Sequence, residues 1–288
     1  MFLLETPEKI LMLIFLVTSM MSIGMQTSIS ELKSVIVSKD FLIRTLLVNF
    51  VVVPIVGMIV VRIFSLPPPV EGAILLLAFT PGGLSAIQFT SHVKGSAALS
   101  GAMVFFLSVL ALFVSPLMLH LVLPKNVAIA VPYGQTLIFL LAYLLLPILI
   151  GMFLLKKVPH IATKLSKPVG LVGVATFLAF MIVTSSDRKV AVGEIGITGV
   201  IAMLLLIVIS MVVGWFMGGG SDPNAKQISA AATSMRNAVL CVAIVQISAP
   251  GHPVLVPLIA FSLLMVPPNM LFTIYSIVQS KRKTRQGL

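Results

Sequence analysis

Apolar residues dominate the chain in long runs, and polar positions gather in short stretches between them. A membrane-spanning helix needs about 20 predominantly apolar residues to cross about 30 Å of hydrocarbon. Runs of about that length recur along the whole sequence. They predict nine spanning helices with these approximate bounds: 8–29, 41–65, 69–93, 96–123, 130–155, 168–186, 195–217, 223–249 and 253–279. The predicted fold class is therefore an all-α polytopic membrane protein.

Composition agrees with this pattern and excludes other classes of protein. The chain is 59% hydrophobic and 9% charged, and its mean hydropathy is +1.16. A soluble globular chain carries about a quarter charged residues, so a soluble enzyme, a nucleic-acid binder and a disordered protein are all excluded. Cys241 is the only cysteine, and the four histidines are far apart. No disulfide framework, metal site or cofactor is expected, and the expected surrounding is the lipid bilayer.

The charged residues test the number of spans, because nine spans divide the loops into two sides. One side collects thirteen basic and three acidic residues: Lys33, Lys39, Arg44, Lys94, Lys156, Lys157, Lys164, Lys167, Lys226, Lys281, Arg282, Lys283 and Arg285, against Glu31, Asp40 and Asp222. The other side collects five of each kind: Lys9, Arg62, Lys125, Arg188 and Lys189, against Glu5, Glu8, Glu71, Asp187 and Glu194. The positive-inside rule places the C-terminus and the basic tail 280–288 in the cytoplasm, and the N-terminus outside.

The remaining basic residue, Arg236, lies in the middle of the eighth predicted span. An arginine at the centre of a membrane helix costs about 2.5–3.5 kcal/mol on insertion scales. The acidic residues within these bounds, Glu8 and Glu71, lie in the first three positions of their spans, so Arg236 has no carboxylate partner near the middle of any span. It must face a wet cavity, the carbonyls of a broken helix or an anionic ligand. The other interpretation is that it hydrogen-bonds exposed backbone and holds the fold, and both roles can be combined.

Two predicted spans carry residues that break a helix near mid-membrane. The third contains Pro81, Gly82 and Gly83, and proline removes a helix donor while glycine loosens the backbone. In the eighth, hydroxyl and amide side chains surround Arg236 and favour a second break. The second span also has a polar residue at an expected kink, because Asn49 precedes Pro54. One interrupted span in each half of the chain indicates a transporter built from inverted repeats.

At these residues the sequence resembles the bile acid:sodium symporter family over nearly its full length. TPGGLSAIQFTSHVKGSAALS (80–100) is similar to that family's first crossing segment, and ATSMRNAVLCVAI (232–244) to its second. SMMSIGMQTSISEL (19–32) resembles its early Gly-Met-rich helix, and NFVVVP (49–54) its kinked helix. The resemblance implies a core domain over about 41–123 and 195–279, with two crossing, unwound helices. It implies a panel domain over about 8–29 and 130–186.

The resemblance also implies sodium ligands, and this chain departs from most of them. In sodium-coupled members the first crossing segment supplies a serine and an asparagine, and these positions are Ala86 and Ile87. A second serine is kept as Ser100, but the threonine one turn later is Val104. The glutamate shared by both sodium sites is Ala232.

The glutamine beside the second sodium site has become Arg236, and its partner from the kinked helix is Asn49. A hard cation needs oxygen ligands with negative charge nearby. Replacing a carboxylate by a methyl group and a carboxamide by a guanidinium makes sodium binding unfavourable. We therefore expect sodium not to be bound.

These observations predict a secondary transporter of a small organic anion, in which Arg236 stands where a cation would sit. Bile acids and other carboxylates all fit the family. We expect an integral protein of a bacterial inner membrane that works by alternating access. The candidate substrate and ion-site residues are Asn49, Pro81, Gly82, Gly83, Ser85, Gln88, Thr90, Ser100, Thr233, Ser234, Arg236, Asn237 and Asn269.

Several alternatives stay open at this stage. Ser85, Thr90 and Ser100 could serve only as packing between helices, and Asn269 only to satisfy a kink after two prolines. A sodium- or proton-coupled symporter with an altered site is the runner-up, although no carboxylate in any span could relay a proton. Loss of the sodium ligands could also mean loss of transport, leaving a membrane sensor or subunit. A membrane-embedded enzyme lacks a catalytic constellation inside the spans.

Overall fold

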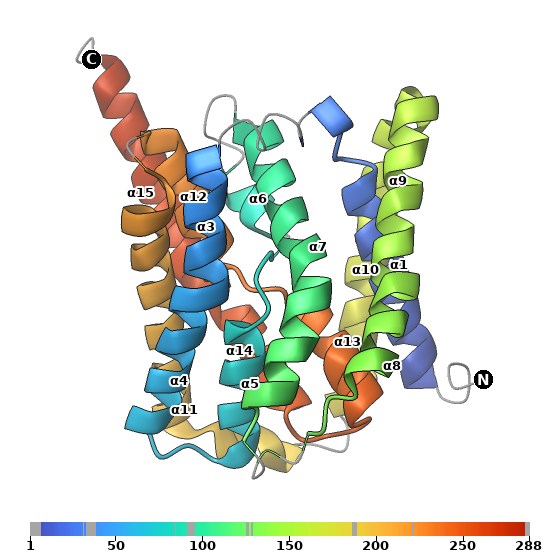
Figure 1. The fold of residues 1–288 in the computed structure, drawn as a ribbon, viewed down its shortest axis with the longest axis vertical. Coiled ribbons are helices and arrows are strands. Elements are labelled where there is room, and N and C mark those ends of the chain that lie inside the picture. The colour runs from blue at the N-terminus through green and yellow to red at the C-terminus, as the bar shows by residue number, and fades with distance from the viewer. Residues whose placement is uncertain are drawn as a thin grey trace.

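The computed structural model describes residues 7–30, 32, 39–83, 85–90, 96–124, 127, 129–185, 189–220 and 222–285. Within these residues every regular element is a helix, and most helices stand side by side in a bundle (Figure 1). The first helix starts at Pro7 at one end of the bundle, and the last ends at Arg285 at the other. A chain that crosses the bundle an odd number of times has its first and last helices ending on opposite sides. The prediction of an all-α polytopic membrane protein is confirmed.

The helices within the described residues follow one another as nine passes through the bundle. The first five passes consist of α1 (Pro7–Gly24), α3 (Lys39–Leu47), η1 (Val48–Val52), α4 (Val53–Ile63), α5 (Pro68–Ala78), α6 (Ser85–Thr90), α7 (Ser96–Val122), α8 (Tyr133–Leu140), η3 (Leu141–Leu145) and α9 (Leu146–Lys157). The last four consist of α10 (Pro159–Ser185), α11 (Lys189–Val213), η4 (Gly214–Gly218), α12 (Pro223–Ser234), α13 (Ala238–Ser248), α14 (Leu255–Leu264) and α15 (Val266–Arg285).

Length and hydropathy make seven described helical stretches suitable for crossing a membrane. Two further apolar helices, Lys9–Gly24 and Pro68–Ala78, are shorter and belong to the first and third predicted spans. The third is short because its helix stops at the predicted break, and α6 continues the pass toward the other end (Figure 1). Each of the nine spans predicted from the sequence therefore corresponds to helix in the structure.

Several helix ends differ from the sequence-based bounds, among them those of α10 and α15. α10 begins at Pro159 and not near residue 168, because a helix tolerates the charges of Lys164 and Lys167 that end the apolar run. Proline suits the first turn of a helix, where its missing N–H has no intrahelical partner. α15 continues to Arg285, so the basic tail begins as helix, and residues 286–288 lie outside the described part of the chain.

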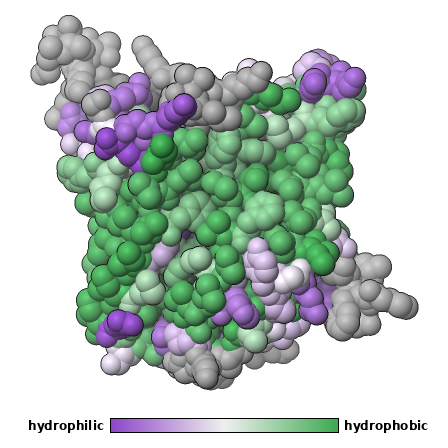
Figure 2. Space-filling view, in the orientation of Figure 1, coloured by the Kyte–Doolittle hydropathy of each residue, from purple (hydrophilic) through white to green (hydrophobic). Residues whose placement is uncertain are grey.

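The surface of the bundle carries the pattern that a bilayer requires. Figure 2 shows a broad apolar belt around the middle, with hydrophilic residues gathered toward the two ends. Large aliphatic side chains such as Ile138, Leu171 and Ile182 are 67–72% exposed on this belt. In water such exposure would be costly, but hydrocarbon is as apolar as these side chains.

Helices α1, α9 and α10 pack against one another and lie together on one side of the bundle (Figure 1). The remaining passes form a second group around α5, α11, α12 and α14. The main contacts between the two groups join α8 to α7 and α13, and α1 to α13. This grouping follows the predicted panel and core ranges, whose division into two domains stays a prediction.

Two glycines allow the closest approach within the α1–α9–α10 group. A Cβ atom at Gly24 would overlap the carbonyl oxygen of Ile148, and one at Gly151 would overlap the carbonyl oxygen of Met21. The backbones of α1 and α9 therefore touch directly, in the way small residues allow between membrane helices. Ser22 adds a hydrogen bond across to α10, because its Oγ donates to the carbonyl oxygen of Ser166 at 2.8 Å.

We expect Gly151→Ala to lower the free energy of unfolding by about 1–3 kcal/mol, because a rigid backbone atom occupies the space of the new methyl group. Gly134→Ala is the control, since a Cβ atom there meets nothing within 4 Å. Thermal unfolding of the purified variants in detergent measures the difference. Equal melting temperatures for the two variants would contradict the close contact.

Candidate substrate and ion site at the crossing of two broken helices

Two helices of the bundle break at the positions that the sequence predicts. α5 ends at Ala78 and α6 starts at Ser85, while α12 ends at Ser234 and α13 starts at Ala238. Two backbone hydrogen bonds join the unwound segments: Gly83 N donates to the Met235 carbonyl oxygen at 3.0 Å, and Asn237 N donates to the Thr80 carbonyl oxygen at 2.9 Å. The third and eighth passes therefore meet at their breaks.

Glycine is required at two neighbouring positions of the first break. Gly82 has φ +90°, which L side chains rarely adopt. A Cβ atom at Gly83 would lie 2.5 Å from the Met235 carbonyl oxygen and 2.6 Å from that of Arg236. Pro81 precedes them and has no N–H, so it cannot continue the helix. The Pro81–Gly83 segment thus brings one backbone against the other.

Helix α7 satisfies two carbonyls near the first break. Ser108 Oγ donates to the Gly82 carbonyl oxygen at 3.0 Å, and Ser115 Oγ donates to that of Phe79 at 2.6 Å. Sequence reasoning missed both serines. Their spacing of seven places them on one face of α7, but serines pack between membrane helices so often that this spacing is no specific signal.

Arg236 lies inside the second break and is 3% exposed. Its Nε donates to the carbonyl oxygen of Leu77 at 2.8 Å, and its Nη2 to that of Ala78 at 2.6 Å. Its Nη1 donates to Asn49 Oδ1 at 2.8 Å and to the Thr233 carbonyl oxygen at 3.2 Å. Four of the five guanidinium N–H groups therefore have protein acceptors.

These acceptors explain how a buried arginine is stabilised without a carboxylate. Leu77 and Ala78 end α5, where carbonyl oxygens have no helix partner and the helix dipole places partial negative charge. The guanidinium covers this end and joins it to the break in α12–α13. The sequence allowed three surroundings for Arg236: a wet cavity, the carbonyls of a broken helix or an anionic ligand. The structure shows the carbonyls of a broken helix. The expected hydrogen bond to Asn49 is confirmed.

Asn49 extends this network to a third element. It lies in η1, a π-helical turn just before Pro54, where the sequence predicts a kink. Its Nδ2 donates to the Thr45 carbonyl oxygen at 3.0 Å and to Thr233 Oγ1 at 3.1 Å. Asn49 is fully buried and holds Arg236 and Thr233 together.

The other polar residues of the second break are also bonded within the protein. Asn237 caps α13, because its Oδ1 accepts from Leu240 N at 3.0 Å. Ser234 Oγ donates to Asn269 Oδ1 at 2.7 Å, and Asn269 Nδ2 donates to the carbonyl oxygen of Met265 at 2.9 Å. The Asn269 side chain thus bonds a carbonyl oxygen at the α14–α15 junction and links this junction to the crossing through Ser234.

The residues after the first break lie farther along α6 and α7. Thr90 Oγ1 and Ser100 Oγ are 2.7 Å apart, and both residues are buried. Ser85, Ile87 and Gln88 belong to α6, and their side chains lie outside what the structure describes. Thr90 and Ser100 therefore form a pair of their own.

Three positions where the resemblance implies sodium ligands carry buried apolar side chains. Ala86, Val104 and Ala232 are each 0% exposed and belong to the hydrophobic core of the bundle. Their methyl groups offer no oxygen to a cation. Within the described residues, no group of three or more histidine, cysteine or acidic side chains is placed to hold a metal ion.

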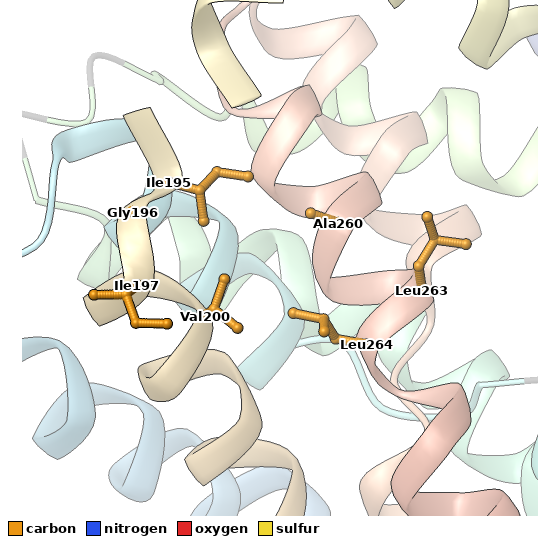
Figure 3. A pocket seen from close by; sticks show the side chains of 7 residues that line it. All are labelled: Ile195, Gly196, Ile197, Val200, Ala260, Leu263 and Leu264. Atoms are coloured by element: carbon orange, nitrogen blue, oxygen red, sulfur yellow. The ribbon is translucent and has the colours of Figure 1, made fainter. Parts of the chain in front are cut away.

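One hollow lies on the surface, between α11 and α14. It has a volume of about 490 Å³, and Figure 3 shows its lining of Ile195, Gly196, Ile197, Val200, Ala260, Leu263 and Leu264. Gly196 has φ +61° and interrupts α11 there. Every lining residue is apolar, so this hollow offers no group that would recognise an anion.

The sequence of the chain was compared with known proteins. Residues 13–217, well over half of the chain, match the sodium bile acid symporter family. The chain belongs to this family. The matched range includes Asn49 and the first break, and it ends before the second break with Arg236.

Two relatives with known names support the assignment. The hepatic sodium/bile acid cotransporter of Rattus norvegicus is 28% identical over 268 residues, covering 89% of this chain and 72% of that protein. A protein of Arabidopsis thaliana named "probable sodium/metabolite cotransporter BASS1, chloroplastic" is 26% identical over 230 residues, covering 78% of this chain. The chain spans 56% of the length of the Arabidopsis protein. Members of the sodium bile acid symporter family are membrane transporters.

Proposed function

We propose that this protein is a secondary transporter of a small organic anion and that it does not require sodium. The observation that carries the proposal is the guanidinium of Arg236 at the crossing, bound to Asn49 and to the carbonyls that end α5. The relatives are named as cotransporters of sodium with bile acids or metabolites. In this chain the covalently attached guanidinium of Arg236 takes the place of the sodium ion.

Electrostatics supports the exclusion of a cation beside Arg236. A second positive charge about 5 Å from the guanidinium would be repelled by about 3 kcal/mol at an effective dielectric constant of about 20. The carbonyl and amide oxygens that face the guanidinium are already used by it. The buried methyl groups of Ala86 and Ala232 add no ligand.

The same charge favours an anion near the crossing. The dipole of α13 adds positive potential, because that helix begins at Ala238 beside the break. Backbone of Pro81–Gly83 and the side chains of Thr233, Ser234, Asn237, Asn269, Thr90 and Ser100 are the proposed surroundings of the substrate. Ser85 and Gln88 stay candidates from the sequence, because their side chains lie outside the described part of the structure. The substrate class is a carboxylate such as a bile acid or a pantoate-like acid.

Alternating access would move the α1, α8–α9 and α10 group, as the panel, against the remaining helices as the core. The contacts of α8 with α7 and α13 lie at the end of the bundle where α8 begins, opposite the end with most of the basic residues (Figure 1). The positive-inside rule makes the basic end cytoplasmic. Separation of the α8 contacts would expose the crossing to the other side.

Uptake into liposomes tests the independence from sodium. Purified protein is first tested with cholate, pantoate and related monocarboxylates for stabilisation against heat, in sodium chloride and in choline chloride. We expect a stabilising anion to act equally in both salts, and its labelled form to exchange in counterflow at equal rates. The reason is that the charge at the crossing is covalently attached.

The matched variant is Arg236→Gln, which removes the fixed charge but keeps a hydrogen-bonding side chain. It is expected to lose most of the counterflow. Sodium-dependent uptake that Arg236→Gln leaves unchanged would overturn the role of Arg236. Stabilisation by an anion without any counterflow would favour a sensor or subunit over a carrier.

A further inference from the structure

A second hollow lies at the basic end of the bundle, between the end of α1 and the end of α9. It has a volume of about 340 Å³ and is lined by Ser28, Ile29, Ser30, Met152, Leu155 and Lys156. Three of its six lining residues are polar, unlike those of the hollow in Figure 3, although most of its lining surface is apolar. It lies away from the crossing, within the α1–α9–α10 group.

The polar half of this hollow suits a phosphate group. Ser28 Oγ and Ser30 Oγ lie 2.9 Å apart, and the exposed Lys156 completes the rim. Three more lysines are exposed where α9 ends and α10 begins: Lys157, Lys164 and Lys167. The carboxylates whose side chains the structure describes belong to other helices: Asp40 to α3, Glu71 to α5 and Asp222 to the cap of α12. The described charge around the hollow is therefore positive.

The apolar half suits a hydrocarbon chain. Met152 and Leu155 form the half-buried wall of the hollow on α9. On the same helix, Leu149 and Phe153 are 48% and 59% exposed, so the wall continues into the apolar belt. Figure 2 shows hydrophilic residues at the α9 end of the molecule directly above this belt. A ligand here has an anionic group at one end and an acyl chain at the other.

We propose that this hollow binds an anionic phospholipid, with the phosphate at Ser28, Ser30 and Lys156 and an acyl chain along α9. The depth agrees, because α9 ends an apolar stretch long enough to cross a membrane, Tyr133–Lys157, and carries two lysines in its last turn. Juxtamembrane lysines attract anionic lipids by about 1 kcal/mol each. α1 and α9 already touch at Gly24 and Gly151. A lipid bound at the ends of both helices would hold this pair together. The site depends on the membrane setting alone and not on what the protein transports.

Native mass spectrometry and thermal unfolding in an uncharged detergent test this site. The added probes are a phosphatidylglycerol, a phosphatidylcholine with the same acyl chains, and glycerol phosphate without chains. We expect phosphatidylglycerol to bind and to raise the melting temperature, and the other two to have little effect. Lys156→Gln is expected to weaken binding about fivefold, and adding Ser30→Ala to weaken it further.

Lys226→Gln is the control, because it removes the same charge at the same end of the bundle but on α12. It should bind phosphatidylglycerol as the unmodified protein does. Equal binding by Lys156→Gln and Lys226→Gln would overturn the proposal. Equal effects of the two phospholipids would show acyl contact without headgroup recognition, and an effect of glycerol phosphate alone would show a site for a soluble anion. Either outcome would overturn it as well.

Discussion

Arg236→Ala is expected to lower the melting temperature by about 5–15 °C and to remove transport. The change withdraws four hydrogen bonds from the crossing, including those to Asn49 Oδ1 and the Ala78 carbonyl oxygen. A buried acceptor left without a partner costs about 1–3 kcal/mol. The end of α5 also loses the positive charge that faces its dipole. Thermal unfolding in detergent and counterflow in liposomes measure the two effects.

Two further variants separate the hydrogen bonds of Arg236 from its charge. Arg236→Lys keeps the charge, but a single ammonium does not match the forked guanidinium, so we expect intermediate stability. Arg62→Ala removes an exposed arginine at the end of α4 and should change neither quantity. If Arg236→Ala and Arg62→Ala had the same melting temperature, the guanidinium would not be holding the two broken helices together.

Gly83→Ala is expected to destabilise the protein by about 3 kcal/mol or more and to abolish transport. The added methyl group would lie 2.5–2.6 Å from two carbonyl oxygens of the facing segment. These atoms belong to the backbone of the second break and cannot rotate away. The hydrogen bond from Gly83 N to the Met235 carbonyl oxygen would be lost as the segments separate.

Gly101→Ala is the matched control for this experiment. Gly101 is a buried glycine in α7, and a Cβ atom there meets nothing within 4 Å. Alanine has the higher helix propensity, so this variant should be as stable as the unmodified protein or slightly more stable. Equal destabilisation by Gly83→Ala and Gly101→Ala would show that loss of glycine itself, and not the contact between the breaks, causes the effect.

The sequence predicted the helices and breaks because these depend on local properties. A run of about 20 apolar residues can satisfy its backbone in a bilayer only as a helix. Pro81 and Gly82 break that helix by their own covalent structure. Arg236 was singled out because no acidic residue lies near the middle of any predicted span.

Several features could not be predicted, because they depend on which surfaces meet. The acceptors of Arg236 include the backbone oxygens of Leu77 and Ala78, which any residue at those positions would present. Ser108 and Ser115 acquire their function only because α7 passes beside the first break. The start of α10 was placed too late because the hydrophobic pattern ends at a charge, whereas a helix does not.

The sequence by itself determined that the chain is a helical membrane protein, that two of its predicted spans are broken, and that one arginine is buried without an acid. These follow from the transfer of side chains and of backbone polar groups into hydrocarbon, which each segment meets on its own. Only the tertiary structure decided that the two breaks lie together and that Arg236 covers the end of α5. Those contacts join residues about 160 positions apart in the chain, and the orientation of a backbone carbonyl is set by packing and not by the residue that carries it.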